Sequence, residues 1–336
     1  MKARFQPYSL QFKQASGTSR GILHTKETFI LTIEHEGKRG IGECALFRGL
    51  SCDDLPDYEE KLQWLCENIN QNKAFIQKEL IQYPSIIFGW EQAFLNLKHG
   101  GDLYFPSAFT TQNKAIKING LIWMGSVDFM TEQIEDKLSK GFDCIKLKIG
   151  VDWPAEKKIL KELRNRYNKN ILEIRVDANG GFSVEQAKEV LNDLAELKIH
   201  SIEQPIKAGQ IEDMQKLCAT TPTSIALDEE LIGIVNFEQK IKLLEEIRPQ
   251  YIILKPALVG GFSSCDEWIG LAEKRNIGWW ITSALESNIG LNAIAQYTFT
   301  KNNPMPQGLG TGALYTNNFD SKLDLEGDQL YFKKII

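Results

Sequence analysis

Five charged residues recur at regular intervals in the middle of the chain, each beside a short apolar run. They are separated by 29, 26, 25 and 27 residues, about the length of one β-strand with its following α-helix. The five residues are Lys148, Asp177, Glu203, Asp228 and Lys255. Three carboxylates and two amines that meet at one place could hold a cation and move a proton.

The three carboxylates, Asp177, Glu203 and Asp228, would repel one another at neighbouring strand ends unless a positive group neutralised them. Carboxylate oxygens without cysteine or histidine suit a hard cation, so Mg²⁺ is the expected cofactor, and Mn²⁺ is an acceptable substitute. The alternative is that each carboxylate forms a structural ion pair with a lysine or arginine. That alternative is reasonable for one carboxylate and weaker for three at matched spacing.

The stretch "FDCIKLKIG" at residues 142–150 alternates as a strand does, so Lys146 and Lys148 share one face. A lysine acts as a base only when neutral, which requires its pKa to fall by about 3 from the reference of about 10.4. A second ammonium and a nearby Mg²⁺ both lower that pKa, so Lys148 is the expected base and Lys146 its tuning neighbour. Lys255 would face it from across the sheet. On an edge strand the two lysines of the stretch would instead simply be solvated.

Strands must position these groups, and the chain from about residue 115 alternates short apolar strands with amphipathic helices. Seven such pairs in a row predict an α/β fold, a (β/α)7-8 barrel of the TIM type, with one unit missing or irregular. A barrel gathers the C-terminal ends of its strands at one mouth, where the five charges would meet.

The residues before this alternation show a different pattern. Residues 27–46 contain two strand-like runs joined by the turn-prone Glu36, Gly37 and Lys38, and helical patterns follow at 53–69 and 85–101. We therefore predict an α+β capping domain at residues 1–114 and a barrel at 115–311. The C-terminal tail, residues 312–336, is expected to pack on the capping domain.

Composition narrows the class of protein. The chain has 336 residues, 43% of them hydrophobic, and a net charge of −5 without a basic run, which argues against nucleic acid as a partner. It has neither a signal-like start nor an apolar run of about 20 residues, so we expect a cytoplasmic protein with no membrane partner. Six scattered cysteines and four histidines lack metal or disulfide spacing. The oligomeric state cannot be read from the sequence.

Five motifs together resemble the enolase superfamily, in its muconate-lactonising-enzyme subgroup: "IKLKIG", "RVDANGGF", "IEQP", "ALDEEL" and "ILKPALVGG". Enzymes of this superfamily combine a lysine or histidine base with Mg²⁺. Within the subgroup, "ILKPALVGG" and "ITSALESNIGLNAIAQ" are most similar to the o-succinylbenzoate synthase family. The resemblance implies a carbon-oxygen lyase of menaquinone biosynthesis. It would convert 2-succinyl-6-hydroxy-2,4-cyclohexadiene-1-carboxylate to o-succinylbenzoate by syn elimination of water through an enediolate.

The resemblance also implies roles for individual residues. Asp177, Glu203 and Asp228 would bind Mg²⁺, while Lys148 would remove the α-proton and deliver it to the departing hydroxyl. Lys255 would stabilise the enediolate from the opposite ring face. The remaining candidates would support the ligands (Arg175, Asn179 and Glu229), touch the substrate (Ser283 and Gly308), or close over its succinyl tail (the loop at residues 16–21).

Three alternatives remain open. A dipeptide epimerase or N-acylamino acid racemase of the same subgroup would use the same five charges, but the epimerases typically carry an Asp-x-Asp pair where this chain has Gly308 and Gly310. A Schiff-base aldolase would use Lys255 or Lys148 as nucleophile and leave the carboxylates unexplained. A barrel that only binds ligands would not need to keep all five charges.

Overall fold

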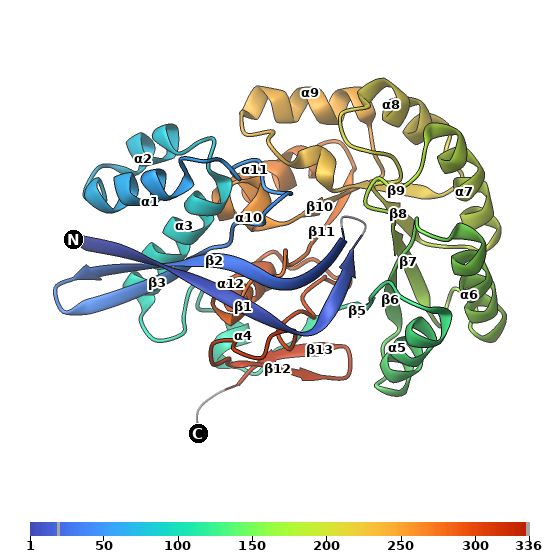
Figure 1. Ribbon diagram of the computed structural model, residues 1–336, viewed down its shortest axis with the longest axis horizontal. Helices are drawn as coiled ribbons and strands as arrows, with labels where there is room; N and C mark the ends of the chain where they lie inside the picture. Colours follow the sequence, from blue (N-terminus) through green and yellow to red (C-terminus); the bar gives the residue numbers. More distant parts are fainter. Residues whose placement is uncertain (19–20, 334–336) are drawn as a thin grey trace.

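The N-terminal part of the chain forms a three-stranded antiparallel sheet. The computed structural model describes residues 1–18 and 21–333 (Figure 1). The strands are β1 (Lys2–Thr18), β2 (Gly21–His35) and β3 (Lys38–Cys44), paired in that order. The predicted turn is present, with Glu36 and Gly37 at φ values of 50° and 74°. The segment predicted as a loop at residues 16–21 is strand as far as Thr18, and residues 19–20 lie outside the described chain.

Helices cover one face of this sheet. They are α1 (Tyr58–Glu67), α2 (Lys73–Glu79) and α3 (Pro84–His99). The short α4 (Ala108–Thr111) lies apart from this sheet, where its Phe109 packs on Phe299 and Phe332. Helix α3 approaches β3 closely because glycines face each other: a Cβ on Gly42 would lie 2.0 Å from the carbonyl oxygen of Gly89. The positions of α1 and α3 agree with the two predicted helical patterns.

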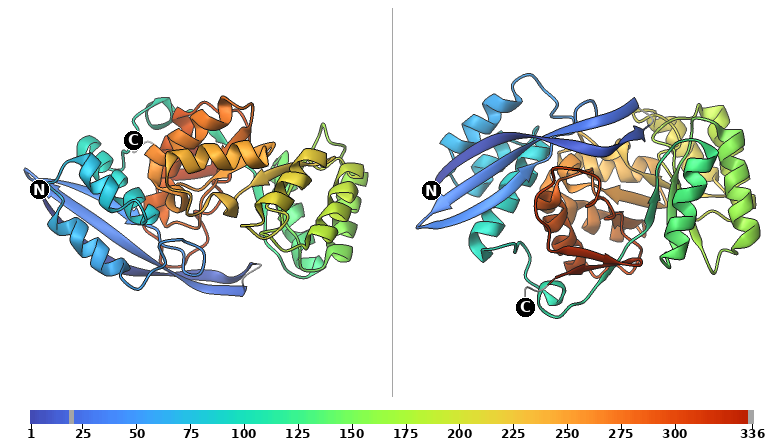
Figure 2. Two further views of the ribbon diagram at one scale, coloured as in Figure 1. Left: turned by 90° about the horizontal axis from the view of Figure 1, so that it is seen from above. Right: turned by 60° about the horizontal axis from the view of Figure 1, so that its bottom comes forward.

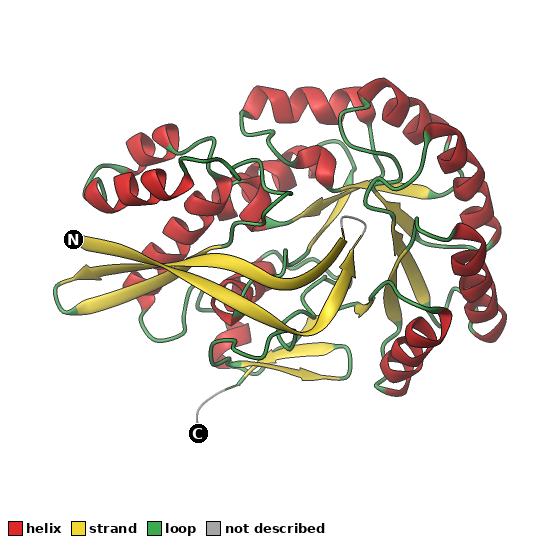
Figure 3. Cartoon of the chain, in the orientation of Figure 1, coloured by secondary structure: helices red, strands yellow, loops and turns green. Residues whose placement is uncertain are grey.

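The rest of the chain builds a curled parallel sheet with helices outside it (Figures 2 and 3). Its strands pair in chain order: β5 (Gly120–Ile122), β6 (Cys144–Lys148), β7 (Glu173–Asp177), β8 (Ser201–Glu203), β9 (Ser224–Leu227), β10 (Tyr251–Leu254) and β11 (Gly278–Ile281). The helices are α5 (Val127–Ser139), α6 (Trp153–Arg166), α7 (Val184–Glu196), α8 (Ile211–Thr220), η1 (Glu229–Leu231), α9 (Phe237–Ile247), α10 (Pro256–Val259), α11 (Gly261–Glu273) and α12 (Asn288–Thr300).

Two residues close this sheet into a ring. Gln307 forms a parallel bridge with Ile118, and Gly308 forms one with Thr282. The amide nitrogen of Asn119 donates to the Gln307 carbonyl at 2.9 Å. The predicted barrel is therefore confirmed, and its irregular unit is the eighth.

Strand alternation sorts the side chains as predicted. On β6, Ile145 and Leu147 are at most 1% exposed and pack in the hydrophobic core beneath the helices. Lys146 and Lys148 point to the other side, into the ring. This separation places the ammonium groups where the other strand ends meet.

The C-terminal tail contacts both parts of the molecule. Its first residues lie on β1, where the Lys13 amide donates to the Leu314 carbonyl at 2.8 Å and Tyr315 packs on Phe12. The hairpin of β12 (Leu323–Glu326) and β13 (Gln329–Phe332) then pairs with β4 (Ile116–Lys117), so this half of the tail lies beside the barrel rather than the cap. No described helix is both long and apolar enough to cross a membrane.

Candidate active site

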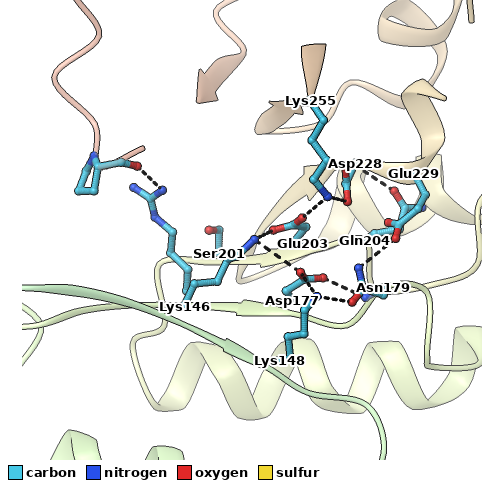
Figure 4. A network of polar contacts seen from close by, with 12 residues as sticks. Lys146, Lys148, Asp177, Asn179, Ser201, Glu203, Gln204, Asp228, Glu229 and Lys255 are labelled. Carbon is cyan, nitrogen blue, oxygen red and sulfur yellow. Dashed lines mark hydrogen bonds and ion pairs between the residues drawn. The ribbon is translucent and has the colours of Figure 1, made fainter. Parts of the chain in front are cut away.

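The charged residues singled out by their spacing meet at the C-terminal ends of the parallel strands (Figure 4). Register explains how: Lys148 pairs with Asp177 across β6 and β7, and Asp177 pairs with Glu203 across β7 and β8. Asp228 and Lys255 directly follow β9 and β10. Consecutive strands thus deliver one functional group each to the same mouth.

The carboxylates are buried and paired with lysines. Asp177, Glu203 and Asp228 are 1%, 1% and 3% exposed. Lys146 Nζ lies 2.6 Å from Glu203 Oε2 and 3.5 Å from Asp177 Oδ2. Lys148 Nζ lies 2.9 Å from Asp177 Oδ2, and Lys255 Nζ contacts Asp228 and lies 3.4 Å from Glu203 Oε1. Three ammonium groups therefore balance three carboxylates.

These ion pairs occupy the carboxylates that are predicted to bind Mg²⁺. Among the described residues, no three His, Cys, Asp or Glu side chains are arranged as a ready-made metal centre. The donor set nevertheless fits a hard cation, because three buried carboxylates at adjacent strand ends accept positive charge between them and present only oxygen atoms. A cation would have to take the places that the ammonium groups hold here.

The pairing also sets the proton affinity of the groups. Burial lowers the pKa of Lys146, but Glu203 and Asp177 outweigh it, so the pKa lies above its ordinary value. Burial likewise opposes the charge of Lys255, yet Asp228 and Glu203 raise its pKa. Burial raises the pKa of Asp177, but the lysines, Lys148 foremost, hold it below its ordinary value. In this arrangement Lys146 and Lys255 keep their protons.

Asn179 and Glu229 support the base candidate. Lys148 Nζ donates to Asn179 Oδ1 at 2.7 Å, and Asn179 Nδ2 donates to Glu229 Oε1 at 2.9 Å. The backbone N–H of Asn179 donates to Asp177 Oδ1 at 3.1 Å, and the left-handed backbone conformation of Asn179, with a φ of 44°, permits this bond. Asn179 therefore holds the lysine and a carboxylate together.

Gln204 supports the next carboxylate and was missed in the sequence, although it is the third letter of "IEQP". Its Oε1 accepts from the amides of Asp228 and Glu230 at 3.1 and 3.3 Å. Its Nε2 donates to Glu230 Oε2 at 3.0 Å. A side-chain amide carries no charge, so nothing in the sequence marks Gln204 as a residue that positions the site.

Arg175 does not reach the site. It shares a face with Asp177 but lies two residues earlier on β7, one layer deeper in the ring. Its guanidinium donates to Glu173 Oε1 at 2.7 Å and to the Pro306 carbonyl at 2.9 Å, and it stacks 4.3 Å from the Trp280 ring. The expectation that Arg175 supports the ligands or the substrate is corrected: it fills the interior of the barrel.

A cavity lies above the charged groups. Ser283 and Gly308 line it, as expected for substrate contacts. The Ser283 hydroxyl, however, donates to Glu286 Oε2 at 2.6 Å and accepts from Thr311 Oγ1 and the Leu285 amide at 2.8 and 3.1 Å. One donor and two acceptor positions are all that a hydroxyl has, so Ser283 shapes the wall rather than offering a hydrogen bond.

Residues whose types do not suggest a catalytic role complete the cavity wall. Two come from the loop after β3, Phe47 and Leu50, and bring the N-terminal part of the chain to the mouth of the barrel. Gly310, already noted in the sequence, also lines the cavity. The others that sequence reasoning missed are Asn119, Leu121, Trp123, Thr282, Ala284, Leu285 and Thr311. The N-terminal part therefore supplies wall rather than catalytic groups.

Glu43 joins this N-terminal part to the barrel. It lies at the end of β3, is fully buried, and accepts from the Ser287 amide and hydroxyl at 3.0 and 2.6 Å and from the Gly290 amide at 3.0 Å. The acceptor thus sits at the N-terminus of α12, where backbone N–H groups favour a carboxylate.

We expect Glu43→Gln to lower the free energy of unfolding by about 2–3 kcal/mol, because hydrogen bonds to a charged acceptor are lost in a buried place. Urea unfolding measures this. The matched control is Glu34→Gln, since Glu34 is 44% exposed and pairs with Arg4 at the surface; its effect should stay within about 0.5 kcal/mol. Equal effects of the two substitutions would contradict the assignment.

Comparison with known proteins agrees with this geometry. Residues 130–330 match the family described as "Enolase C-terminal domain-like". The chain is 43% identical to o-succinylbenzoate synthase of Desulfotalea psychrophila over 98% of each chain. The crystal structure of MenC from that organism covers 98% of this chain and 99% of its own, with a TM-score of 0.88 and 41% identity.

Two more distant relatives are informative. An N-succinylamino acid racemase of Thermus thermophilus is 33% identical over 86% of this chain and 79% of its own. An o-succinylbenzoate synthase of Thermosynechococcus elongatus, solved with Mg in its active site, shares the fold at a TM-score of 0.75 and 23% identity, covering 92% of each chain. The chain thus belongs to the enolase superfamily and, within it, to the o-succinylbenzoate synthase family.

Proposed function

We propose that this protein is a Mg²⁺-dependent o-succinylbenzoate synthase, a carbon-oxygen lyase that acts on a small carboxylate substrate in menaquinone biosynthesis. The observation that carries the proposal is the 43% identity to o-succinylbenzoate synthase of Desulfotalea psychrophila over nearly the full length of both chains. The five charged side chains at one barrel mouth support it, because the reaction needs a base, a stabilised carboxylate and a proton donor.

Asp177, Glu203 and Asp228 would hold the cation. They are buried, adjacent and offer only oxygen, which suits Mg²⁺ and also Mn²⁺. When bound, Mg²⁺ would draw negative charge from the substrate carboxylate and make the neighbouring C–H bond more acidic.

Lys148 is the proposed base. Its Nζ reaches the cavity from β6 and is held by Asp177 and Asn179. Engagement of Asp177 as a ligand would release Lys148 Nζ from this ion pair, and Lys146 on the same face would keep a positive charge beside it. Lys148 then takes the α-proton and returns it to the hydroxyl that leaves from the same face.

Lys255 has the complementary role. It follows β10, on the other side of the carboxylates from β6, so a ring held between the strands would lie between two amines. Its pairing with Asp228 keeps it protonated. A protonated Lys255 stabilises negative charge that develops on the ring, by electrostatic attraction and by a cation–π contact.

The direct test is formation of o-succinylbenzoate from 2-succinyl-6-hydroxy-2,4-cyclohexadiene-1-carboxylate with Mg²⁺, run beside panels of dipeptides and N-succinylamino acids. We expect conversion of the first substrate and no epimerisation of dipeptides. The racemase relative makes the N-succinylamino acids the informative comparison. Epimerisation of dipeptides without o-succinylbenzoate would overturn the proposal, and borohydride trapping of a lysine with a carbonyl substrate would favour the aldolase alternative.

A further inference from the structure

The cavity wall opposite the carboxylates has a polar character of its own. Asn119 precedes β5 and Thr282 follows β11, the two end strands of the parallel sheet, and Gly308 lies in the segment that joins them. Asp177, Glu203 and Asp228 belong to the middle strands. The ring of strands around the cavity therefore carries the carboxylates on one side and Asn119, Thr282 and Gly308 on the other.

Two buried atoms of this wall have no partner. Asn119 and Thr282 are 3% and 7% exposed, and Asn119 Oδ1 and Thr282 Oγ1 form no hydrogen bond with any described residue. Buried polar atoms in folded proteins are almost always paired. Because both side chains line the cavity, a partner would come from whatever the cavity holds.

Gly308 makes room for the Thr282 side chain. A Cβ at this position would lie 2.5 Å from Thr282 Oγ1 and 2.8 Å from its methyl carbon. The Thr282 side chain therefore lies over Gly308, and Asn119 stands on the other side of the segment that contains Gly308. Both polar side chains thus line the same stretch of the cavity wall.

The donor and acceptor pattern selects the group. The Asn119 amide oxygen accepts a hydrogen bond, whereas the Thr282 hydroxyl can donate one. A hydroxyl or a water molecule has both functions, since it can donate to Asn119 and accept from Thr282. A carboxylate has no hydrogen for Asn119 Oδ1.

We infer that Asn119 and Thr282 form a hydroxyl-binding subsite that holds the substrate hydroxyl lost as water. The inference rests on the proposed function and adds two binding residues to it. On elimination the C–O bond breaks with its electron pair on oxygen, the proton from the Lys148 ammonium joins that oxygen, and the water stays beside Asn119 and Thr282. Reactions that only invert a carbon centre have no use for such a subsite, so it favours dehydration.

Binding measurements test the subsite without turnover. In a Lys148→Ala background with Mg²⁺, the dissociation constants of the hydroxylated substrate and of o-succinylbenzoate are compared, because the product lacks the hydroxyl. Adding Thr282→Val should weaken substrate binding about fivefold to tenfold and leave product binding unchanged. Thr282→Ser keeps a hydroxyl and should restore substrate binding. With Lys148 intact, Thr282→Val should lower kcat/KM by a similar factor.

Thr298→Val is the matched control. Thr298 lies on α12, is 3% exposed, and its Oγ1 also lacks a hydrogen bond with any described residue, but it is not part of the cavity wall. Its substitution should leave both dissociation constants unchanged.

The outcomes separate the two proposals. Unchanged substrate binding in Thr282→Val, or equal loss of substrate and product binding, would overturn the subsite. Failure of the wild type to form o-succinylbenzoate would overturn the proposed reaction. If the wild type formed no product, the subsite would still be supported by substrate binding that weakens in Thr282→Val. Absence of substrate binding would overturn the subsite as well.

Discussion

Replacing Lys148 with alanine should lower kcat for o-succinylbenzoate formation by about 10³- to 10⁴-fold, because the variant lacks the group that removes and returns the proton. Lys148 faces the cavity, and Asp177 and Asn179 hold its Nζ at 2.9 and 2.7 Å. Lys148→Arg should be equally inactive, since a guanidinium keeps the positive charge but stays protonated. Steady-state rates at saturating Mg²⁺ measure both variants.

Lys240→Ala is the matched control for this prediction. Lys240 lies on α9, is 1% exposed, and pairs with Glu267 at 2.8 Å, well outside the cavity wall. Its loss should lower the midpoint of urea unfolding and leave kcat near the wild-type value. Activity above about one tenth of the wild type in Lys148→Ala, with the fold intact, would remove Lys148 from the role of base.

Removal of the metal should have the second largest effect. In EDTA we expect turnover to fall by at least about 10³-fold, because the cation supplies several kcal/mol of stabilisation to the developing charge. Mg²⁺ should restore the rate fully, and Mn²⁺ should restore it in part. Activity that persists in EDTA would contradict the metal assignment.

The fold should survive the same treatment. Lys146, Lys148 and Lys255 pair with the three carboxylates, so each buried carboxylate has a counter-charge that does not depend on the cation. Thermal unfolding should therefore remain cooperative in EDTA, with a higher midpoint when Mg²⁺ is added, as expected for a ligand that binds only the folded state. Loss of cooperative unfolding in EDTA would mean that the metal is needed for folding.

The parts of the fold that could be predicted from sequence are those with a strong periodic signal. Strand β6 alternates apolar and charged residues from Ile145 to Lys148, and the spacing of Lys148, Asp177, Glu203, Asp228 and Lys255 reflects one strand and one helix each. A charged group at the end of an apolar run is costly to bury, which is why it stands out. The same logic failed for Arg175, because parity fixes the face of a strand and not the depth along it.

Other features lacked any such signal. Phe47 and Leu50 are apolar residues in a loop, and nothing in their type tells that they line a cavity formed with distant strands. Nothing in the types of Asn119 and Thr282 predicts that their side-chain oxygens are buried without a hydrogen bond to any described residue. The ion pairs between lysines and carboxylates also depend on distances across the ring, which spacing along the chain does not give.

The closure of the ring has a consequence for biosynthesis of the chain. Gln307 pairs with Ile118, and its side chain accepts from the Ile281 amide at 2.8 Å, so contacts far apart in sequence complete the barrel. Contacts between distant residues form slowly because a long loop must close first. A nascent chain that ends at residue 300 would carry every charged group of the site, yet its ring would still be open, so chemistry must wait until Gln307 and Gly308 have been added and have paired.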